Sequence, residues 1–288
     1  MGVKGRLIQR IYGRDELPWG TSPDEFRPEA VQGTLRKLDF MFGEHRYFPL
    51  HVHGWEHVPP SPVLVVANHS GGTTVPDAWG WAMAWYRHFG YQRPLHVLAH
   101  EMILATRATG EYFGQRGLLR GEPEVARRAL TEWRRDVLVM PGGDQDVWRP
   151  YSMRYQVCFG GRTGYAKLAL RAGVPIVPVA NAGAHETLIV LSRGRRIAQM
   201  LGLRQVARAN IFPIHLSLPW GLAVGPWPHI PPPTTLRYRI GEAIAPTWRG
   251  TGEPPEAAVM DLDLATRRAM QGLLDELRAE TTTPDRGR

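Results

Sequence analysis

The hydrophobic pattern of the chain alternates between two kinds of stretch. Short apolar runs bounded by Pro, Gly or Asn are typical of buried strands, and apolar residues three and four positions apart are typical of helices. The runs predict strands at 47–54, 63–67, 95–99, 137–140, 175–179 and 235–240. The periodic stretches predict helices at 28–42, 78–89, 122–135, 162–171, 185–203 and 256–279. This alternation predicts an α/β fold with a mixed, mostly parallel sheet flanked by helices.

The expected domain organisation is simple. We expect a basic N-terminal helical arm over residues 1–44, one α/β domain over 45–280, and a frayed tail over 281–288. Pro49 cannot donate to a ladder, so the strand at 47–54 should lie at the sheet edge. The chain opens without the apolar core of a secretory signal, and prolines interrupt the uncharged run 211–230. We therefore expect no transmembrane helix.

Charge and cysteine usage restrict the partners. The formal net charge of +8 and the pI near 10.0 indicate an anionic partner: lipid headgroups, nucleic acid or a phosphorylated substrate. The sequence contains no recognisable nucleic-acid-binding motif, so a nucleic acid is not expected. The single cysteine, Cys158, excludes an intrachain disulfide and fits a reducing compartment. These features together predict a cytoplasmic protein at the inner face of a membrane.

The candidate chemistry centres on the turn that follows the strand at 63–67. This strand ends at Asn68 and His69, and a Gly-rich turn then leads to Asp77 at the start of an aromatic helix. Open α/β sheets hold their ligands at such strand ends. In one interpretation, His69 takes a proton from an attacking hydroxyl and Asp77 fixes its tautomer. In the other, His69 is a hydrogen-bonded core residue and Asp77 only caps its helix.

Two further turns carry polar side chains. The segment 112–121 combines glycines with Arg116 and Arg120, which suits either an anion cradle or solvated surface charge. The strand at 137–140 runs into Pro141-Gly142-Gly143-Asp144-Gln145-Asp146, with Arg149 shortly after. Because parallel strands end at one edge of a sheet, this second strand-end turn should lie beside that of His69.

His51 and His53 form an H-x-H pair on the predicted edge strand. Residues two positions apart on a strand share a face, so the two rings are placed to bind a divalent metal. Asp144 or Asp146 would complete such a site. This arrangement leaves a metal-dependent hydrolase open as an alternative function.

The order of the turns resembles the lysophospholipid and glycerolipid acyltransferase superfamily. Four blocks match in order: Asn68-His69-Ser70-Gly71-Gly72 through Asp77, then 114–120, 140–144 and 173–179. Seven residues separate His69 from Asp77, whereas the family pattern has four, and the longer turn resembles a subgroup near the diacylglycerol acyltransferases. The third block usually reads Glu-Gly-Thr-Arg. Here Asp144 or Asp146 stands in place of its Glu, and Arg149 in place of its Arg.

The resemblance implies transfer of a fatty acyl group from acyl-CoA, as co-substrate, to a hydroxyl of a lipid acceptor. It implies His69 as the general base and Asp77 as its orienting partner, with neither a cofactor nor a metal ion. The Gly71-Gly72 turn or the Gly142-Gly143 turn would receive the oxyanion. Substrate contacts are expected from the remaining residues of the blocks: Asn68, Ser70, Gly71, Gly72, Arg116, Arg120, Gly142, Gly143, Asp144 and Arg149.

The uncharged run 211–230 bears on membrane contact. Trp220 and Trp227 suit an interface between apolar and aqueous surroundings, so we expect a loop that touches a membrane or shelters an acyl chain. An ordinary loop packed on the domain is the alternative. A non-catalytic module that binds anionic lipid remains a third functional class beside the acyltransferase and the hydrolase.

Overall fold

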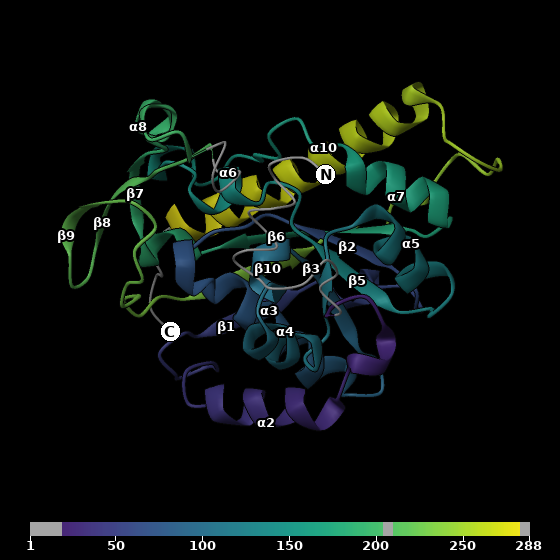
Figure 1. Cartoon of the computed structure of the whole chain (residues 1–288), viewed down its shortest axis with the longest axis horizontal. Helices are drawn as coiled ribbons and strands as arrows, with labels where there is room; N and C mark the ends of the chain where they lie inside the picture. The colour runs from purple at the N-terminus through teal and green to yellow at the C-terminus, as the bar shows by residue number, and fades with distance from the viewer. Residues whose placement is uncertain (1–18, 204–209, 283–288) are drawn as a thin grey trace.

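The computed structural model describes residues 19–203 and 210–282 (Figure 1). Within them, seven strands form the main sheet, in the order β1-β10-β6-β2-β5-β3-β4. Strands β6, β2, β5, β3 and β4 are parallel; β10 runs antiparallel to β6 and pairs in parallel with β1. Their bounds are β1 Leu50–His53, β2 Leu64–Ala67, β3 Leu95–Ala99, β4 Leu118–Arg120, β5 Asp136–Val139, β6 Ile176–Ala182 and β10 Leu236–Ile240. The mixed, mostly parallel sheet is therefore confirmed, with β1 at its edge.

Helices cover both faces of this sheet (Figure 1). Successive residues of a strand point to opposite faces. Val65 of β2 packs in one core with α2 (Pro28–Leu38) and α3 (Pro76–Phe89). Leu64 and Val66 pack in the other core with α5 (Pro123–Thr131), α7 (Gly164–Ala172) and α10 (Glu256–Thr282). Strand β2 is buried along its whole length, which explains its continuous apolar run.

The ends of the chain differ in part from the expected arm and tail. Helix α2 buries Val31 and Leu35 against the core of the sheet, so residues 28–38 belong to the α/β body. Thr281 lies within α10, and its hydroxyl is bonded to that of Tyr155. The basic arm 1–18 and the tail 283–288 lie outside the described residues.

The segment 105–121 contains two elements that the sequence analysis did not predict. Helix α4 (Arg107–Gly114) is capped by Thr106, whose hydroxyl accepts from the backbone N–H of Thr109 at 3.2 Å. The edge strand β4 begins two residues after Arg116. Both elements are short, so their apolar periodicity is too brief to register in a sequence window.

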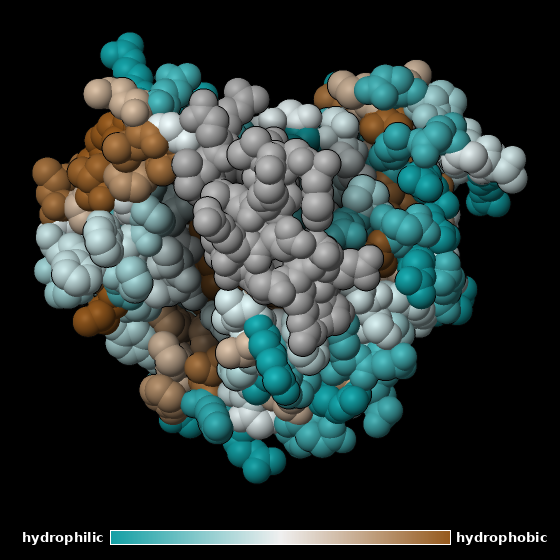
Figure 2. Space-filling model, viewed as in Figure 1, coloured by the Kyte–Doolittle hydropathy of each residue, from teal (hydrophilic) through white to brown (hydrophobic). Residues whose placement is uncertain are grey.

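A second, antiparallel sheet is formed by β7 (Ile189–Ser192), β8 (Ile214–Ser217) and β9 (Gly221–Val224). The helix predicted at 185–203 is wrong except for α8 (Arg195–Met200), and the loop predicted at 211–230 is wrong because a hairpin occupies its centre. The prolines of this run lie before, between and after its strands, so they remove no ladder hydrogen bond within them. Figure 2 shows hydrophobic residues gathered where Figure 1 places this sheet and α8.

The remaining helical segments are short. They are α6 (Asp144–Val147) and the 3-10 turns Pro23–Glu25, Trp55–His57, Gly72–Thr74, Glu101–Leu104, Tyr151–Met153 and Ala184–Thr187. Among the described helices, none has the length and hydropathy needed to cross a bilayer.

Candidate active site

Three neighbouring strand ends converge at one edge of the main sheet. Strand β2 lies between β5 and β6 and is parallel to both. Asn68 and His69 follow β2, the turn with Asp146 follows β5, and Asn181 lies near the end of β6. Side chains that are far apart in sequence therefore meet at the carboxyl ends of these strands.

The ring of His69 is held by Asp77. Nδ1 of His69 lies 2.8 Å from Oδ2 of Asp77. The same oxygen accepts the backbone N–H of Ser70 at 2.7 Å, and Oδ1 accepts that of Ala78 at 2.8 Å. The Asp77 side chain is fully buried, whereas 17% of the His69 side chain is exposed. Because a carboxylate only accepts, Nδ1 carries the proton in neutral His69, and Nε2 has the lone pair.

The seven residues between His69 and Asp77 form a strained turn that brings the two side chains together. Gly71 and Gly72 have φ of 93° and 62°, and Val75 has φ of 42°, which is rare for a β-branched residue. A Cβ on Gly71 would lie 2.5 Å from Cδ of Pro76, so a side chain there would collide with the start of α3. Asp77 is the second residue of α3 rather than its N-cap, which is Val75. The helix thus presents the carboxylate at its positive end.

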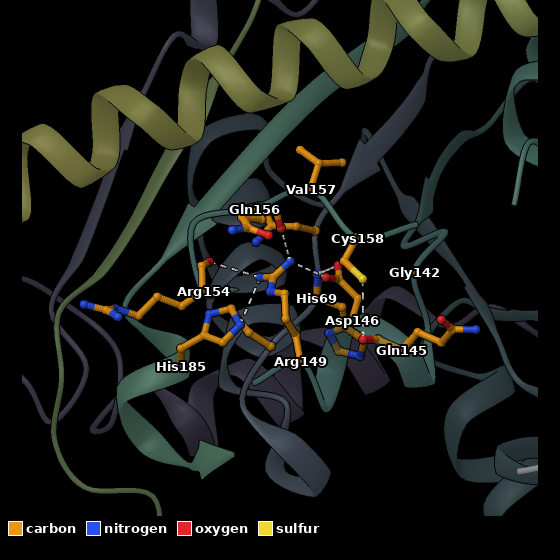
Figure 3. Close-up of polar contacts among 12 residues, drawn as sticks. His69, Gly142, Gln145, Asp146, Arg149, Arg154, Gln156, Val157, Cys158 and His185 are labelled. Carbon is orange, nitrogen blue, oxygen red and sulfur yellow. Dashed lines mark hydrogen bonds and ion pairs between the residues drawn. The ribbon is translucent and has the colours of Figure 1, made fainter. Parts of the chain in front are cut away.

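A buried ion pair supports His69 from the neighbouring turn (Figure 3). Oδ2 of Asp146 accepts the backbone N–H of His69 at 2.7 Å, and its Oδ1 accepts from Nη1 of Arg149. Arg149 also donates to the carbonyl of Gln156 and, at 2.9 Å, to Nε2 of His185. The side chains of Asp146 and Arg149 have no exposed surface. From the sequence, Asp146 was a candidate stand-in for a family Glu or a candidate metal ligand, and its bond to the backbone of His69 was not predicted.

These environments shift the pKa values of the two histidines in opposite directions. Burial lowers the pKa of His69, but the charge and hydrogen bond of Asp77, helped by the charge of Asp146, outweigh burial and raise the pKa above 6.5. Burial, together with the positive charges of Arg149 and Arg154, places the pKa of His185 well below 6.5. His185 is therefore neutral, and its Nε2 accepts from Arg149.

Comparisons with known proteins agree with the geometry. A family model described as Acyltransferase matches residues 49–182, which include all three strand ends. Over this range the chain is similar to the acyltransferase superfamily. An uncharacterized protein of Mycobacterium tuberculosis is 28% identical to this acyltransferase over 283 residues, which are 96% of this chain and 74% of that protein.

Two other relatives carry functional names. The chicken "DGAT1/2-independent enzyme synthesizing storage lipids" is 26% identical over 166 residues, 57% of this acyltransferase and 48% of that protein. The crystal structure of the 1-acyl-sn-glycerophosphate acyltransferase PlsC from Thermotoga maritima is 16% identical, with a TM-score of 0.47. That match covers 94% of this chain and 88% of that structure.

The acyltransferase uses Asn68 and Ser70 for internal hydrogen bonds rather than for the expected substrate contacts. Both side chains are buried. Asn68 and Asn181 exchange three hydrogen bonds of 2.6–3.0 Å, and the Ser70 hydroxyl donates to Oδ1 of Asn181 at 3.1 Å. These bonds join the turn after β2 to β6. Asn181 was not predicted from the sequence, although a polar residue at the end of an apolar strand is a signal that could have identified it.

The Gly142-Gly143 turn is engaged within the protein. The amide of Gly143 donates to the carbonyl of Met140 at 3.1 Å, so it is not free to receive an oxyanion. A Cβ on Gly142 would lie 2.2 Å from Cβ of Asp146, so a glycine here makes room for the buried ion pair. Asp144 is paired with Arg162 at 2.7 Å on the surface. Arg149 is buried, which removes it from the expected substrate contacts.

Arg116 and Arg120 lie away from His69. Arg116 precedes β4 and so lies at the amino ends of the parallel strands, whereas His69 lies at their carboxyl ends. Its Nε donates to the hydroxyl of Thr34 at 2.7 Å. Arg120 ends β4, three strands from β2, and its Nε donates to the carbonyl of Trp19 at 2.8 Å. With neighbouring strands about 4.8 Å apart, the guanidinium of Arg120 lies well away from the ring of His69, and contact of either arginine with a distant part of a substrate stays a prediction.

The alternative metal site is not assembled. His51 and His53 are exposed on the edge strand β1, four strands from β5 and the turn of Asp144 and Asp146. Across 19–203 and 210–282, no group of three or more His, Cys, Asp or Glu side chains is arranged to hold a metal ion. The hydrolase alternative loses the geometry on which it depended.

Proposed function

We propose that this acyltransferase moves a fatty acyl group from acyl-CoA to a hydroxyl of a lipid, with His69 as general base. The observation that supports this most is the 2.8 Å contact between Nδ1 of His69 and the buried Asp77, on a histidine that is itself partly exposed. A ring that is held at Nδ1, with Nε2 left to act as the proton acceptor, is what proton transfer to or from a substrate requires.

In the proposed reaction, Nε2 of His69 takes the proton of the acceptor hydroxyl while the hydroxyl oxygen attacks the thioester carbonyl carbon. The resulting tetrahedral intermediate then expels the thiolate of CoA, which takes the proton back from the imidazolium. Asp77 stabilises the imidazolium in between. The backbone amides of the Gly71-Gly72 turn are our candidates for binding the oxyanion.

For the acceptor we propose a glycerolipid hydroxyl. The name of the chicken relative refers to storage lipids, which supports an acceptor from lipid metabolism. The arginine of the third block, Arg149, is committed to Asp146 and His185, so acceptor recognition here does not rest on that arginine binding a phosphate. We further propose that the enzyme works as a peripheral protein at the cytoplasmic face of the inner membrane.

The test is an acyl-transfer assay with a labelled long-chain acyl-CoA and a panel of lipid acceptors, read by mass spectrometry. His69→Ala should lower the rate by about 10²–10⁴-fold, the usual contribution of a general base. The matched control is His51→Ala/His53→Ala, which should transfer at the wild-type rate. Equal rates in wild type and His69→Ala would contradict the proposal, and loss of activity in the control would revive the metal-dependent alternative.

A further inference from the structure

The small sheet has apolar side chains on both of its faces. Its inner face buries Val190, His215 and Ala223, one from each strand. The opposite side of the sheet carries Leu191, Leu216 and Leu222, which are 50%, 44% and 66% exposed. An antiparallel sheet with one buried face ordinarily alternates to polar residues on the solvated side. The outward leucines therefore indicate a partner that is itself apolar.

The exposed surface continues beyond the strands. The exposed side chains of Leu218, Trp220 and Trp227 extend the surface formed by the three leucines. We call the whole surface the outer face: Leu191, Leu216, Leu218, Trp220, Leu222 and Trp227. Figure 2 shows hydrophobic residues gathered at the left, where Figure 1 places α8 and β7–β9. Exposed apolar patches of this kind are typical of binding surfaces, and tryptophan favours the boundary between bilayer and water.

The stretch of sequence that carries the outer face has charged residues of one sign. Between Glu186 and Glu242 the sequence contains seven arginines and neither Asp nor Glu. Two of these arginines, Arg195 and Arg196, are exposed at the start of α8, shortly after β7. Basic side chains beside an apolar surface complement anionic lipid headgroups above an acyl layer.

Segments that flank the small sheet contact the turn that follows His69. The hydroxyl of Thr73 donates to the carbonyl of Trp227 at 3.2 Å, and that of Thr74 lies 3.3 Å from Nε2 of His229. A Cβ on Gly72 would lie 2.4 Å from Cδ2 of Leu188, immediately before β7. A surface that binds the outer face is therefore held beside the His69 turn.

We propose that the outer face docks on the surface of an anionic lipid bilayer and so presents the His69 turn to acceptors in that bilayer. Only the clause about acceptors rests on the proposed function. An acidic protein would account for the arginines but not for the exposed leucines, and a second copy of this chain would bring the arginines of both copies together. The bilayer accounts for both features.

The experiment is flotation of the full chain with phosphatidylcholine vesicles that contain or lack phosphatidylglycerol. Leu191→Ser/Leu216→Ser/Leu222→Ser should reduce binding at least about tenfold, because it removes the buried apolar area. The matched control replaces three exposed apolar residues outside the outer face by serine: Phe40, Met260 and Leu264, which are 66%, 49% and 46% exposed. This control should bind as wild type does. Arg195→Glu/Arg196→Glu, which leaves the sheet intact, should lose binding to the phosphatidylglycerol vesicles specifically.

Measuring both flotation and acyl transfer distinguishes a failure of the docking proposal from a failure of the proposed function. His69→Ala should float with vesicles as wild type does while losing acyl transfer. If wild type floats through the outer face but transfers no acyl group, the docking surface stands and the proposed function fails. If the outer-face variant floats like wild type, the docking surface is wrong whatever the activity. Wild type that ignores vesicles and forms a dimer abolished by the outer-face variant would also overturn it, in favour of a second copy.

Discussion

Oδ2 of Asp146 accepts the backbone N–H of His69 at 2.7 Å, although the two residues are 77 positions apart in the sequence. The carboxylate comes from the turn after β5 and the amide from the end of β2, so the bond joins two adjacent strand ends. Asp77 holds the ring of His69, and Asp146 holds its backbone. The histidine is therefore positioned from two directions, by one carboxylate from the start of α3 and another from the turn after β5.

Loss of Asp146 should destabilise the protein more than loss of its surface neighbour. Asp146→Ala leaves Arg149 buried without its counter-ion, which typically costs about 3–5 kcal/mol. The matched control is Asp144→Ala, which breaks a partly exposed pair with Arg162 and should cost at most about 1 kcal/mol. Urea unfolding measures both. Equal losses would mean that the buried pair carries no special role, whereas partial rescue by Asp146→Ala/Arg149→Met would support it.

The pH dependence of transfer should report the pKa of His69. A general base must be deprotonated, so kcat/KM should rise with pH through a pKa above 6.5. Asp77→Asn removes the main influence that raises the pKa, while burial still lowers it. The acid limb should therefore move to lower pH, with a reduced plateau. If the acid limb of Asp77→Asn lies at the same pH as that of wild type, Asp77 does not set the pKa of His69.

The same raised pKa affects stability with the opposite sign. Protonated His69 gains from Asp77 in the folded state, so its stabilisation is fully present below pH 6.5 and is lost as pH rises through the folded-state pKa. The difference in free energy of unfolding between wild type and His69→Gln should shrink over that range. Urea unfolding on both sides of the pKa checks this, and a difference independent of pH would contradict it.

Gly72 should tolerate no side chain. Its φ is 62°, and an added Cβ would lie 2.4 Å from Leu188. Gly72→Ala should cost about 1–3 kcal/mol through overpacking, and it should lower transfer by shifting the turn after His69. The control is Gly33→Ala in α2, where nothing lies within 4 Å and alanine should stabilise by about 0.5–1 kcal/mol. Thermal unfolding and the acyl-transfer assay together distinguish the two.

Arg116 should be dispensable for catalysis. Its guanidinium lies against Thr34 and the ring of Tyr112, 3.5 Å from the ring centroid, at the edge of the sheet away from His69. Arg116→Met should therefore leave the KM for either substrate unchanged, and it should cost no more than about 1–2 kcal/mol of stability. A large rise in KM would place a substrate phosphate at this residue, as the family resemblance implies.

The sequence alone determined the main elements and the central turn. Continuous apolar runs such as 63–67 and 175–179 identified buried strands, because residues buried on both faces leave a signal within a few positions. The pairing of His69 with Asp77 was also readable, since both residues belong to one strand-turn-helix unit. The segment 185–230 was misread, because its short strands also bear apolar residues on the side that faces away from the body.

Only the tertiary structure decided how the other polar residues are used. Asp146 reaches His69 across 77 residues, and Asn181 reaches Asn68 across 113, because β5 and β6 flank β2 in the sheet. Arg149 resembled a substrate ligand in sequence, yet it is buried, and Arg116 lies at the opposite edge of the sheet. Strand order sets such neighbours, and it follows from how the helices pack over the whole sheet rather than from any local pattern.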